Sequence, residues 1–269
     1  MNHRGYGRSN GVRAISRKHF IGLTAKSMAA TALLAPFTTK QGSGQAIKAI
    51  AFDAFTLFDT RPILLVAEKL YPGKGAELMG LWRNRQFEYT WLRSLSKNYK
   101  DFRQVTDDAL QYAAAALKLD LNTDNKAQLM SAVGNMRFIP EAGATLGQLK
   151  EMRLQLAILS NATPAMLHAA IDNSGLQHAF DFIISTDSIK TYKPDPAAYQ
   201  LGIDAFKVKK EAILFVAFGG WDAAGAKTFG YPTVWINAGG LPAEQLDVKP
   251  DFICRNLTEL TGYVKERNR

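Results

Sequence analysis

The sequence predicts an α/β protein with a doubly wound parallel sheet that is interrupted early by a long helical segment. Short apolar runs alternate with helical patterns after residue 140, and this alternation is typical of a parallel sheet with helices on both faces. One such run comes much earlier, at 49–52, and about 75 residues of helical periodicity follow it without a strand signal. The order of the elements therefore predicts a core that is built from two separate stretches of the chain.

The first strand ends in a carboxylate. Ala49 to Phe52 form a short apolar run that is typical of a buried parallel strand, and Asp53 follows directly. Ligands of an open α/β sheet bind outside the carboxyl ends of the strands, so Asp53 is expected to face a site. A buried carboxylate without a partner would cost several kcal/mol or be neutralised. The alternative is that Asp53 only caps the following turn.

The segment 62–137 is predicted to be helical. Its apolar residues recur at helical spacing, as in Ile63, Val66, Ala67 and Leu70, in Phe87, Trp91 and Leu92, and in Val105, Ala109 and Tyr112. The predicted division is therefore a basic tail at 1–46, an α/β core at 47–61 and 138–269, and a helical domain at 62–137.

A second strand is predicted at 154–159, and Ser160 and Asn161 follow it. Capping of the next helix is the ordinary alternative role for such residues, and Pro164 suits the first turn of that helix. Because Asp53 ends the first strand, we favour a place for Ser160 and Asn161 in the same site. The remaining strands are predicted at 182–185, 212–217, 231–237 and 252–253, with a last helix reaching Val264.

Five motifs together resemble the haloacid dehalogenase superfamily, and within it most closely the (S)-2-haloacid dehalogenase, or type II, branch. They are Asp53-Ala54-Phe55-Thr56-Leu57-Phe58-Asp59, the run from Leu81 to Trp91, Ser160-Asn161, the run from Tyr192 to Tyr199, and Trp221-Asp222-Ala223-Ala224-Gly225-Ala226. The resemblance covers about 47–260. It implies a Rossmann-like core, with the helical segment 62–137 as a cap domain that closes the site and excludes water.

The resemblance also implies the catalytic residues. Asp53 would be the nucleophile, accompanied by Thr56, and Lys193 would neutralise its carboxylate and developing negative charge. The hydroxyl of Ser160 would hydrogen-bond the Asp53 carboxylate or a substrate oxyanion. Asp222, together with Lys193, would position or deprotonate the hydrolytic water.

The residues that the resemblance implies for substrate and halide binding are Arg83, Asn161, Phe87, Phe102, Tyr199 and Trp221. The guanidinium of Arg83 suits either a substrate carboxylate or a leaving halide, and the amide of Asn161 can donate to a halide. Taken without the resemblance, Phe87 and Phe102 are more typical of a helix core, and Tyr199 of an aromatic on a helix face.

The implied activity is hydrolytic dehalogenation of short (S)-2-haloalkanoic acids. Asp53 would displace the halide from carbon 2 with inversion, and water would then hydrolyse the resulting ester. The expected partner is this small-molecule substrate. No cofactor or metal is expected, because Phe55 stands where phosphatases of the superfamily carry a second Asp. The alternatives are a Mg²⁺-dependent phosphatase that uses Asp53 and Asp222, and an inactive exported binding protein on the same scaffold.

Three departures from the family pattern motivate the binding-protein alternative. Ala217 stands where the family usually has Ser, Gly219 stands where it usually has Asn, and no Gly precedes Thr56. Ser and Asn would supply hydrogen bonds around the nucleophile and the water. Their replacement predicts an altered substrate, slow turnover or no turnover.

Residues 1–46 resemble an export signal. They hold seven Lys or Arg and no acid, with a basic region that ends at Ser16–Ile21, a mildly apolar stretch at Gly22–Phe37 and a close at Gly44–Ala46. Arg17-Lys18 followed by Phe20-Ile21 resembles a twin-arginine signal with Lys in the second place. We expect a periplasmic protein, and the alternative is a disordered basic tail on a cytoplasmic enzyme.

The net charge of +9 comes mostly from this tail, because the rest of the chain holds 26 basic and 24 acidic residues. No nucleic-acid partner is therefore expected. The single cysteine, Cys254, excludes an intramolecular disulfide and is expected to be buried. The four histidines show no metal-ligand spacing. Dimers are common among similar enzymes, so a homodimer is one expectation.

Overall fold

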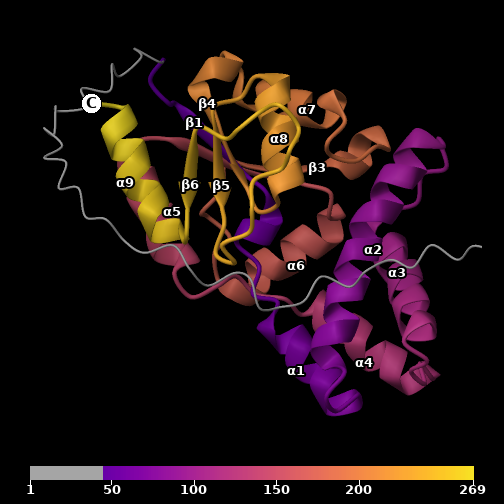
Figure 1. The fold of residues 1–269 in the computed structure, drawn as a ribbon. Coiled ribbons are helices and arrows are strands. Elements are labelled where there is room, and N and C mark those ends of the chain that lie inside the picture. The colour runs from indigo at the N-terminus through magenta and orange to yellow at the C-terminus, as the bar shows by residue number, and fades with distance from the viewer. Residues whose placement is uncertain (1–44) are drawn as a thin grey trace, which may run out of the picture. The chain divides into compact units, whose positions relative to one another are not determined.

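The computed structural model describes residues 45–269, and six of its strands form one fully parallel sheet (Figure 1). The strands are β1 (Ala49–Phe52), β2 (Gln155–Ser160), β3 (Phe182–Ser185), β4 (Ile213–Ala217), β5 (Thr233–Ile236) and β6 (Phe252–Cys254). Their order is β3-β2-β1-β4-β5-β6. The predicted fold class is confirmed, and each strand lies where an apolar run predicted it.

The strand order places a topological switch point between β1 and β4. From β1 the chain runs outward to β2 and β3, then returns to β4 on the other side of β1 and runs outward again. The two halves of the sheet therefore wind in opposite directions, and a crevice forms beyond the carboxyl ends of β1 and β4. Asp53 follows β1 at this point.

Helices cover both faces of the sheet (Figure 1). Helices α5 (Ala142–Glu151), α6 (Pro164–Ser174) and α9 (Leu257–Arg267) share one hydrophobic cluster, and α7 (Pro196–Phe206) and α8 (Gly220–Phe229) share the other. Alternate residues of β1 point to opposite faces, so Ile50 and Phe52 belong to the first cluster and Ala49 and Ala51 to the second. Burial on both faces explains why the strands read as continuous apolar runs rather than alternating ones.

Four α-helices follow β1 before the chain returns to the core at Phe138, and we call residues 62–137 the helical insert. They are α1 (Arg61–Leu70), α2 (Gly75–Leu95), α3 (Phe102–Ala116) and α4 (Thr123–Gly134). The carboxylate of Asp101 accepts from the backbone N–H of Gln104 and so caps α3, and Asn122 caps α4 in the same way. Helices α2 and α3 pack together, and the Trp82 indole donates to the carbonyl of Thr106 at 2.8 Å.

The chain leaves and re-enters the core at adjacent points. Asp59 N–H donates to the carbonyl of Arg137 at 2.8 Å, and Ile139 N–H donates to the carbonyl of Leu57 at 2.7 Å. These two hydrogen bonds hold the two connections side by side in antiparallel fashion. The helical character of the segment is confirmed, while its division from the core as a separate domain, at 61/62 and 137/138, stays a prediction.

The predicted export signal at 1–46 lies outside the described residues, except for its last two. Ile47 is the first buried residue that the structure describes, and its N–H donates to the Asn268 side chain at 2.8 Å. Within 45–269 no helix is long and apolar enough to cross a membrane. Cys254 is fully buried, as expected.

Candidate active site

Asp53 lies at the carboxyl end of β1, and its carboxylate is buried. Its backbone N–H donates to the carbonyl of Val216 at 2.9 Å, which extends the β1–β4 ladder by one residue. The chain then turns through a short 3-10 helix, η1 (Ala54–Thr56), which Asp53 does not cap with its side chain. The Thr56 hydroxyl donates to the Asp53 carbonyl at 2.6 Å. Thr56 therefore fixes the backbone of the nucleophile loop, while the Asp53 carboxylate remains directed toward the site.

Lys193 forms ion pairs with two carboxylates at once. Its ammonium is 3.1 Å from Asp53 Oδ1 and 2.6 Å from Asp222 Oδ2, and all three side chains are buried. Burial by itself would lower the pKa of Lys193, but the charges of Asp222 and Asp53 outweigh burial and raise it. Lys193 therefore stays cationic. The structure thus brings three predicted site residues from three different loops into one cluster.

Asp222 lies in the first turn of α8 and is fully buried. Its Oδ1 accepts a hydrogen bond from the Tyr199 hydroxyl at 2.8 Å. The pKa of Asp222 is raised to about 6, mainly by burial and also by the negative charge of Asp53. Lys193 and Tyr199 act in the opposite direction and lower it. Asp222 can therefore exchange a proton near neutral pH, which a general base requires.

Gly225 allows Tyr199 to reach Asp222. A Cβ at position 225 would lie 2.5 Å from the Tyr199 hydroxyl and 2.7 Å from Pro194 Cβ. Any side chain there would push α8 away from α7 and from the loop that carries Lys193. The glycine in the motif that begins at Trp221 thus has a physical role in assembling the site.

Ser160 is the last residue of β2, the strand next to β1, and Asn161 follows it. Asn161 Oδ1 accepts from the backbone N–H of Lys193 at 2.9 Å, and its amide nitrogen makes no hydrogen bond to residues 45–269. That nitrogen is therefore left as a donor for a ligand. Ser160 Oγ accepts from Ala162 N–H at 3.1 Å, and within 45–269 no hydrogen bond joins it to Asp53. Helix α6 is capped instead by Thr163, which accepts from Met166 N–H.

The end of β4 contributes no polar side chain to the site. Ala217 is buried beside Asp53's strand, and Gly219 begins the turn into α8. A Cβ at position 219 would lie 2.7 Å from the Trp221 indole nitrogen, so the absence of a side chain there makes room for the indole. The Trp221 ring packs against Phe87 at 5.2 Å and against Trp91 at 5.4 Å between centroids.

An aromatic cluster centred on Phe55 covers one side of the site. The Phe55 ring lies 5.5 to 6.1 Å, between centroids, from four other rings, those of Phe58, Phe87, Phe102 and Phe218. Phe55 comes two residues after Asp53, whereas Phe87 and Phe102 belong to the helical insert. This cluster therefore joins the insert to the nucleophile loop.

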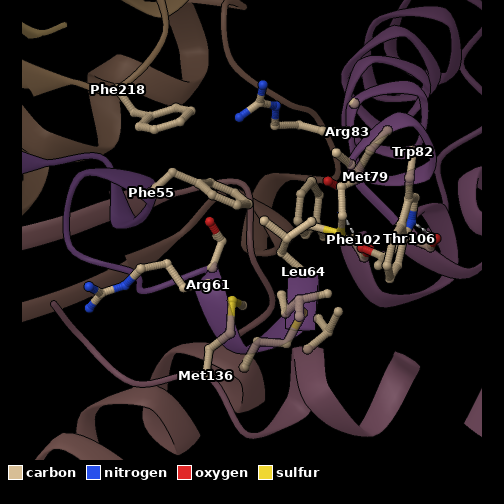
Figure 2. A pocket seen from close by; sticks show the side chains of 17 residues that line it. Phe55, Arg61, Leu64, Met79, Trp82, Arg83, Phe102, Thr106, Met136 and Phe218 are labelled. Carbon is tan, nitrogen blue, oxygen red and sulfur yellow. Dashed lines mark hydrogen bonds between the residues drawn. The ribbon is translucent and has the colours of Figure 1, made fainter. Parts of the chain in front are cut away.

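A cavity of about 290 Å³ lies beyond Phe55, between the insert and the core (Figure 2). Phe55, Arg83 and Phe102 line it, but Asp53, Lys193 and Asp222 do not. Of the residues predicted to bind substrate, Arg83 and Phe102 therefore contact the cavity. Phe87, Asn161, Tyr199 and Trp221 do not line it. Tyr199 contacts Asp222 instead, and Phe87 and Trp221 pack on each other.

Sequence reasoning missed most of the cavity wall. Ala76, Met79, Gly80 and Arg83 line it from one face of α2. Their spacing of three, four and seven residues is a helical stripe, which could have indicated a shared face. The sequence gives no sign, however, that this face borders a cavity instead of packed side chains.

Arg83 and Arg85 have different surroundings. Arg85 pairs with Glu88 at 2.6 Å, and its guanidinium also lies 4.0 Å from the centre of the Tyr112 ring. Arg83 forms no salt bridge with any carboxylate in 45–269. Its guanidinium is therefore available for an anionic ligand.

The residues around Asp53 do not fit a Mg²⁺ site. Magnesium prefers several oxygen ligands in octahedral geometry, but the Lys193 ammonium already lies between the Asp53 and Asp222 carboxylates. Asp222 is fully buried, with one oxygen bound by Lys193 and the other by Tyr199. Phe55 offers no oxygen. In the part of the chain that the structure describes, no three His, Cys, Asp or Glu side chains group as a metal site would require.

These features define the class of protein. Residues 47–230 match the haloacid dehalogenase-like hydrolase family, and the chain belongs to this family. It is 42% identical to haloacetate dehalogenase H-2 of Moraxella sp. (strain B), over 77% of this chain and 92% of that protein. It is also 42% identical to the (S)-2-haloacid dehalogenase of Pseudomonas sp. (strain YL), over 78% of this chain and 91% of that one.

Solved structures give the same result. One L-2-haloacid dehalogenase matches with a TM-score of 0.81 and 44% identity, over 82% of this chain and all of the other. The L-2-haloacid dehalogenase of Xanthobacter autotrophicus matches with a TM-score of 0.75 and 34% identity, over 81% of this chain and 98% of the other. The similarity therefore includes both the core and the helical insert.

Proposed function

We propose that the protein hydrolyses the carbon–halogen bond of short (S)-2-haloalkanoic acids and releases 2-hydroxy acids. The observation that carries this proposal is the buried Asp53, whose carboxylate is paired with Lys193 at the switch point of the sheet. The similarity to dehalogenases of the same substrate class over most of the chain supports it. The partner is thus a small 2-halo carboxylate.

In the first step an oxygen of Asp53 attacks carbon 2 and forms a carbon–oxygen bond while the carbon–halogen bond breaks. The halide leaves with the bonding pair, the configuration inverts, and an ester joins the substrate to Asp53. Arg83 and the Asn161 amide nitrogen are the donors that we assign to the substrate carboxylate and the halide. The Lys193 ammonium, 3.1 Å from Asp53 Oδ1, holds the attacking carboxylate in place and balances its negative charge.

In the second step water attacks the acyl carbon of the ester. We assign Asp222 as the base that takes the proton of the water, because its raised pKa suits proton exchange near neutral pH. Lys193 stabilises the negative charge that develops on the ester oxygen. The acyl–oxygen bond then breaks, and the leaving alkoxide takes the proton held by Asp222 and becomes the 2-hydroxy acid. The carboxyl group of Asp53 loses its remaining proton to solvent, which regenerates the carboxylate.

One observation favours a second candidate function, an inactive binding protein. Ala217 and Gly219 leave the end of β4 without a donor or acceptor side chain near the water. Such a protein would still bind a halo acid but would not turn it over. Asp53→Asn would then leave the affinity for the acid unchanged.

The test measures halide release from (S)-2-chloropropionate in the presence of EDTA, with wild type beside Asp53→Asn. We expect release by the wild type alone. A mass increase on the peptide that contains Asp53, trapped during turnover, would identify the ester. Binding without release by either protein would establish the binding protein, and release that EDTA abolishes would establish metal-dependent chemistry.

We also propose that residues 1–46 direct export to the periplasm. The seven basic residues without an acid and the apolar stretch Gly22–Phe37 support this proposal. Removal of 1–46 would leave Ile47 and its hydrogen bond to Asn268 in place. Fractionation of cells and N-terminal sequencing of the mature protein test it. A protein that keeps Met1 and stays in the cytoplasm would contradict export.

A further inference from the structure

The cavity beyond Phe55 is not needed by a two- or three-carbon acid. The reacting carbon of the substrate must lie at Asp53, and Asp53 does not line the cavity. A short acid that reacts at Asp53 and is bound by Arg83 would therefore leave most of the cavity empty. Its volume of about 290 Å³ equals roughly ten water-sized groups, at ~30 Å³ each.

The wall of the cavity selects an apolar occupant. Three of the polar side chains on it are already engaged, because Gln86 Nε2 donates to Thr106 Oγ1 at 2.5 Å and Arg61 is paired with Asp59 at 2.7 Å. Thr60 also lines the cavity and is exposed. Arg83 also lines the cavity, and no carboxylate within residues 45–269 forms a salt bridge with it. A sugar or a phosphate ester would find few free partners there, whereas a hydrocarbon chain with one acidic end would match the wall.

Arg83 lies toward one end of the cavity. Figure 2 shows Arg83 and Phe218 near Phe55, and Met136 farther from Arg83, on the side where Arg61 lies. Phe55 follows Asp53 by two residues, and Phe218 follows β4, the neighbour of β1. The end that holds Arg83 is therefore the end nearest the nucleophile.

The wall of the cavity is adaptable. Met79, Met136 and Met166 line the cavity, and the flexible methionine side chain adjusts to chains of different length. Phe55 lines the cavity and lies two residues after Asp53 in the chain. A chain that starts at Asp53 passes Phe55 to enter the cavity.

We propose that the cavity holds the alkyl chain of the substrate, so that the preferred 2-halo acids carry a chain of roughly four to eight carbons beyond carbon 2. This proposal rests on the proposed function and specifies its substrate. Each methylene that enters the apolar space raises kcat/KM roughly fourfold, since its burial contributes ~0.8 kcal/mol. The increase ends where the chain exceeds the length of the cavity.

Gly80 provides a variant that shortens the cavity. It lies on the cavity face of α2 with Met79 and Arg83, and a Cβ built there meets no atom within 4 Å. Gly80→Leu therefore places a side chain on the cavity side without displacing the backbone, and a helix favours Leu over Gly. The matched control is Gly147→Leu in α5, where a Cβ also meets nothing within 4 Å and the position is exposed.

The experiment measures kcat/KM for a series of (S)-2-bromoalkanoic acids from propionate to decanoate. We expect the wild type to improve roughly fourfold per methylene up to a maximum. In Gly80→Leu the ratio of kcat/KM for octanoate to that for propionate falls at least tenfold, whereas Gly147→Leu keeps the wild-type ratio. A wild-type profile that declines from propionate onward, or an unchanged ratio in Gly80→Leu, overturns the proposal.

A binding measurement separates this proposal from the proposed function. Titration calorimetry with halogen-free octanoate and acetate requires no catalysis. Tighter binding of octanoate than of acetate, weakened in Gly80→Leu but not in Gly147→Leu, supports the chain site even if no acid is turned over. Equal affinity for the two acids contradicts the chain site even if chloropropionate is dehalogenated.

Discussion

Lys193 is shared between Asp53 and Asp222, and this sharing connects the proposed nucleophile to the proposed base. While both carboxylates are ionised, one buried cation faces two buried anions. Excess negative charge in a buried site favours the uptake of a proton. Asp222 takes it, since it is fully buried and its pKa is raised to about 6. The protonation state of one residue therefore controls whether the second chemical step can proceed.

We predict that kcat falls as the pH falls through about 6, because protonated Asp222 cannot accept a proton from water. In Tyr199→Phe this acidic limb should move to higher pH, because the hydroxyl of Tyr199 lowers the pKa of Asp222. The measurement is kcat against pH for both proteins with a saturating halo acid. Coincident acidic limbs in wild type and variant would show that the Asp222 carboxylate is not the group that titrates.

At the scale of elements, two aspartates connect helices to the starts of strands. Asp181 accepts from the Lys150 ammonium on α5 and from the backbone N–H of Leu156 on β2, both at 2.7 Å. Asp251 makes the same pair of bonds with Lys227 on α8 and the N–H of Thr233 on β5. Each aspartate thus fixes a helix at the end of the sheet that lies away from the site.

Asp181→Ala should lower the free energy of unfolding by about 2 kcal/mol at pH 7, because it leaves a strand N–H without its acceptor. Partial burial would raise the pKa of Asp181, but the bonds from Lys150 and Leu156 lower it. The contribution of the ionised form is present above the unfolded value of 3.8 and is lost as the pH falls below it. Urea unfolding at pH 7 and pH 3.5 measures both effects.

The matched control is Asp204→Ala, because Asp204 is exposed on α7 and accepts only from Gln200. It should unfold at nearly the wild-type urea concentration. If Asp181→Ala loses no more free energy of unfolding than the control does, water replaces the missing acceptor.

The strands could be predicted from the apolar runs, whereas only the family resemblance implied that Lys193 and Asp222 lie near Asp53. Strands buried on both faces must be continuous apolar runs, and the polar residues Asp53 and Ser160 interrupt two of them where ligands bind. The cavity could not be predicted, because its wall combines Phe55, Met79 and Met136 from separate segments. Nor could the sequence show that Thr56 would bond to the backbone of Asp53, since loop hydrogen bonds depend on the tertiary path of the chain.

At the scale of the whole described chain, the insert is linked to the core next to the catalytic lysine. The Tyr99 hydroxyl donates to Asp187 Oδ1 at 2.6 Å, and the Tyr192 hydroxyl donates to the carbonyl of Lys100 at 2.5 Å. The two tyrosine rings stack at 5.2 Å between centroids. Tyr192 directly precedes Lys193, so the position of the insert and the position of the lysine are mechanically connected.

We predict that Tyr99→Phe weakens the closure of the insert over the site. The ring remains stacked on Tyr192, but Asp187 loses the hydrogen bond that does most to lower its pKa and keeps only Lys190 at 3.0 Å. Loss of one hydrogen bond to a charged group costs ~1.5 kcal/mol, so KM for the halo acid should rise roughly tenfold. Limited proteolysis near residues 96–101 should also become faster.

Tyr112→Phe is the control, because the Tyr112 ring packs on Arg85 within the insert. Equal KM values and equal cleavage rates in the two variants would mean that the aromatic cluster around Phe55 alone holds the insert in place.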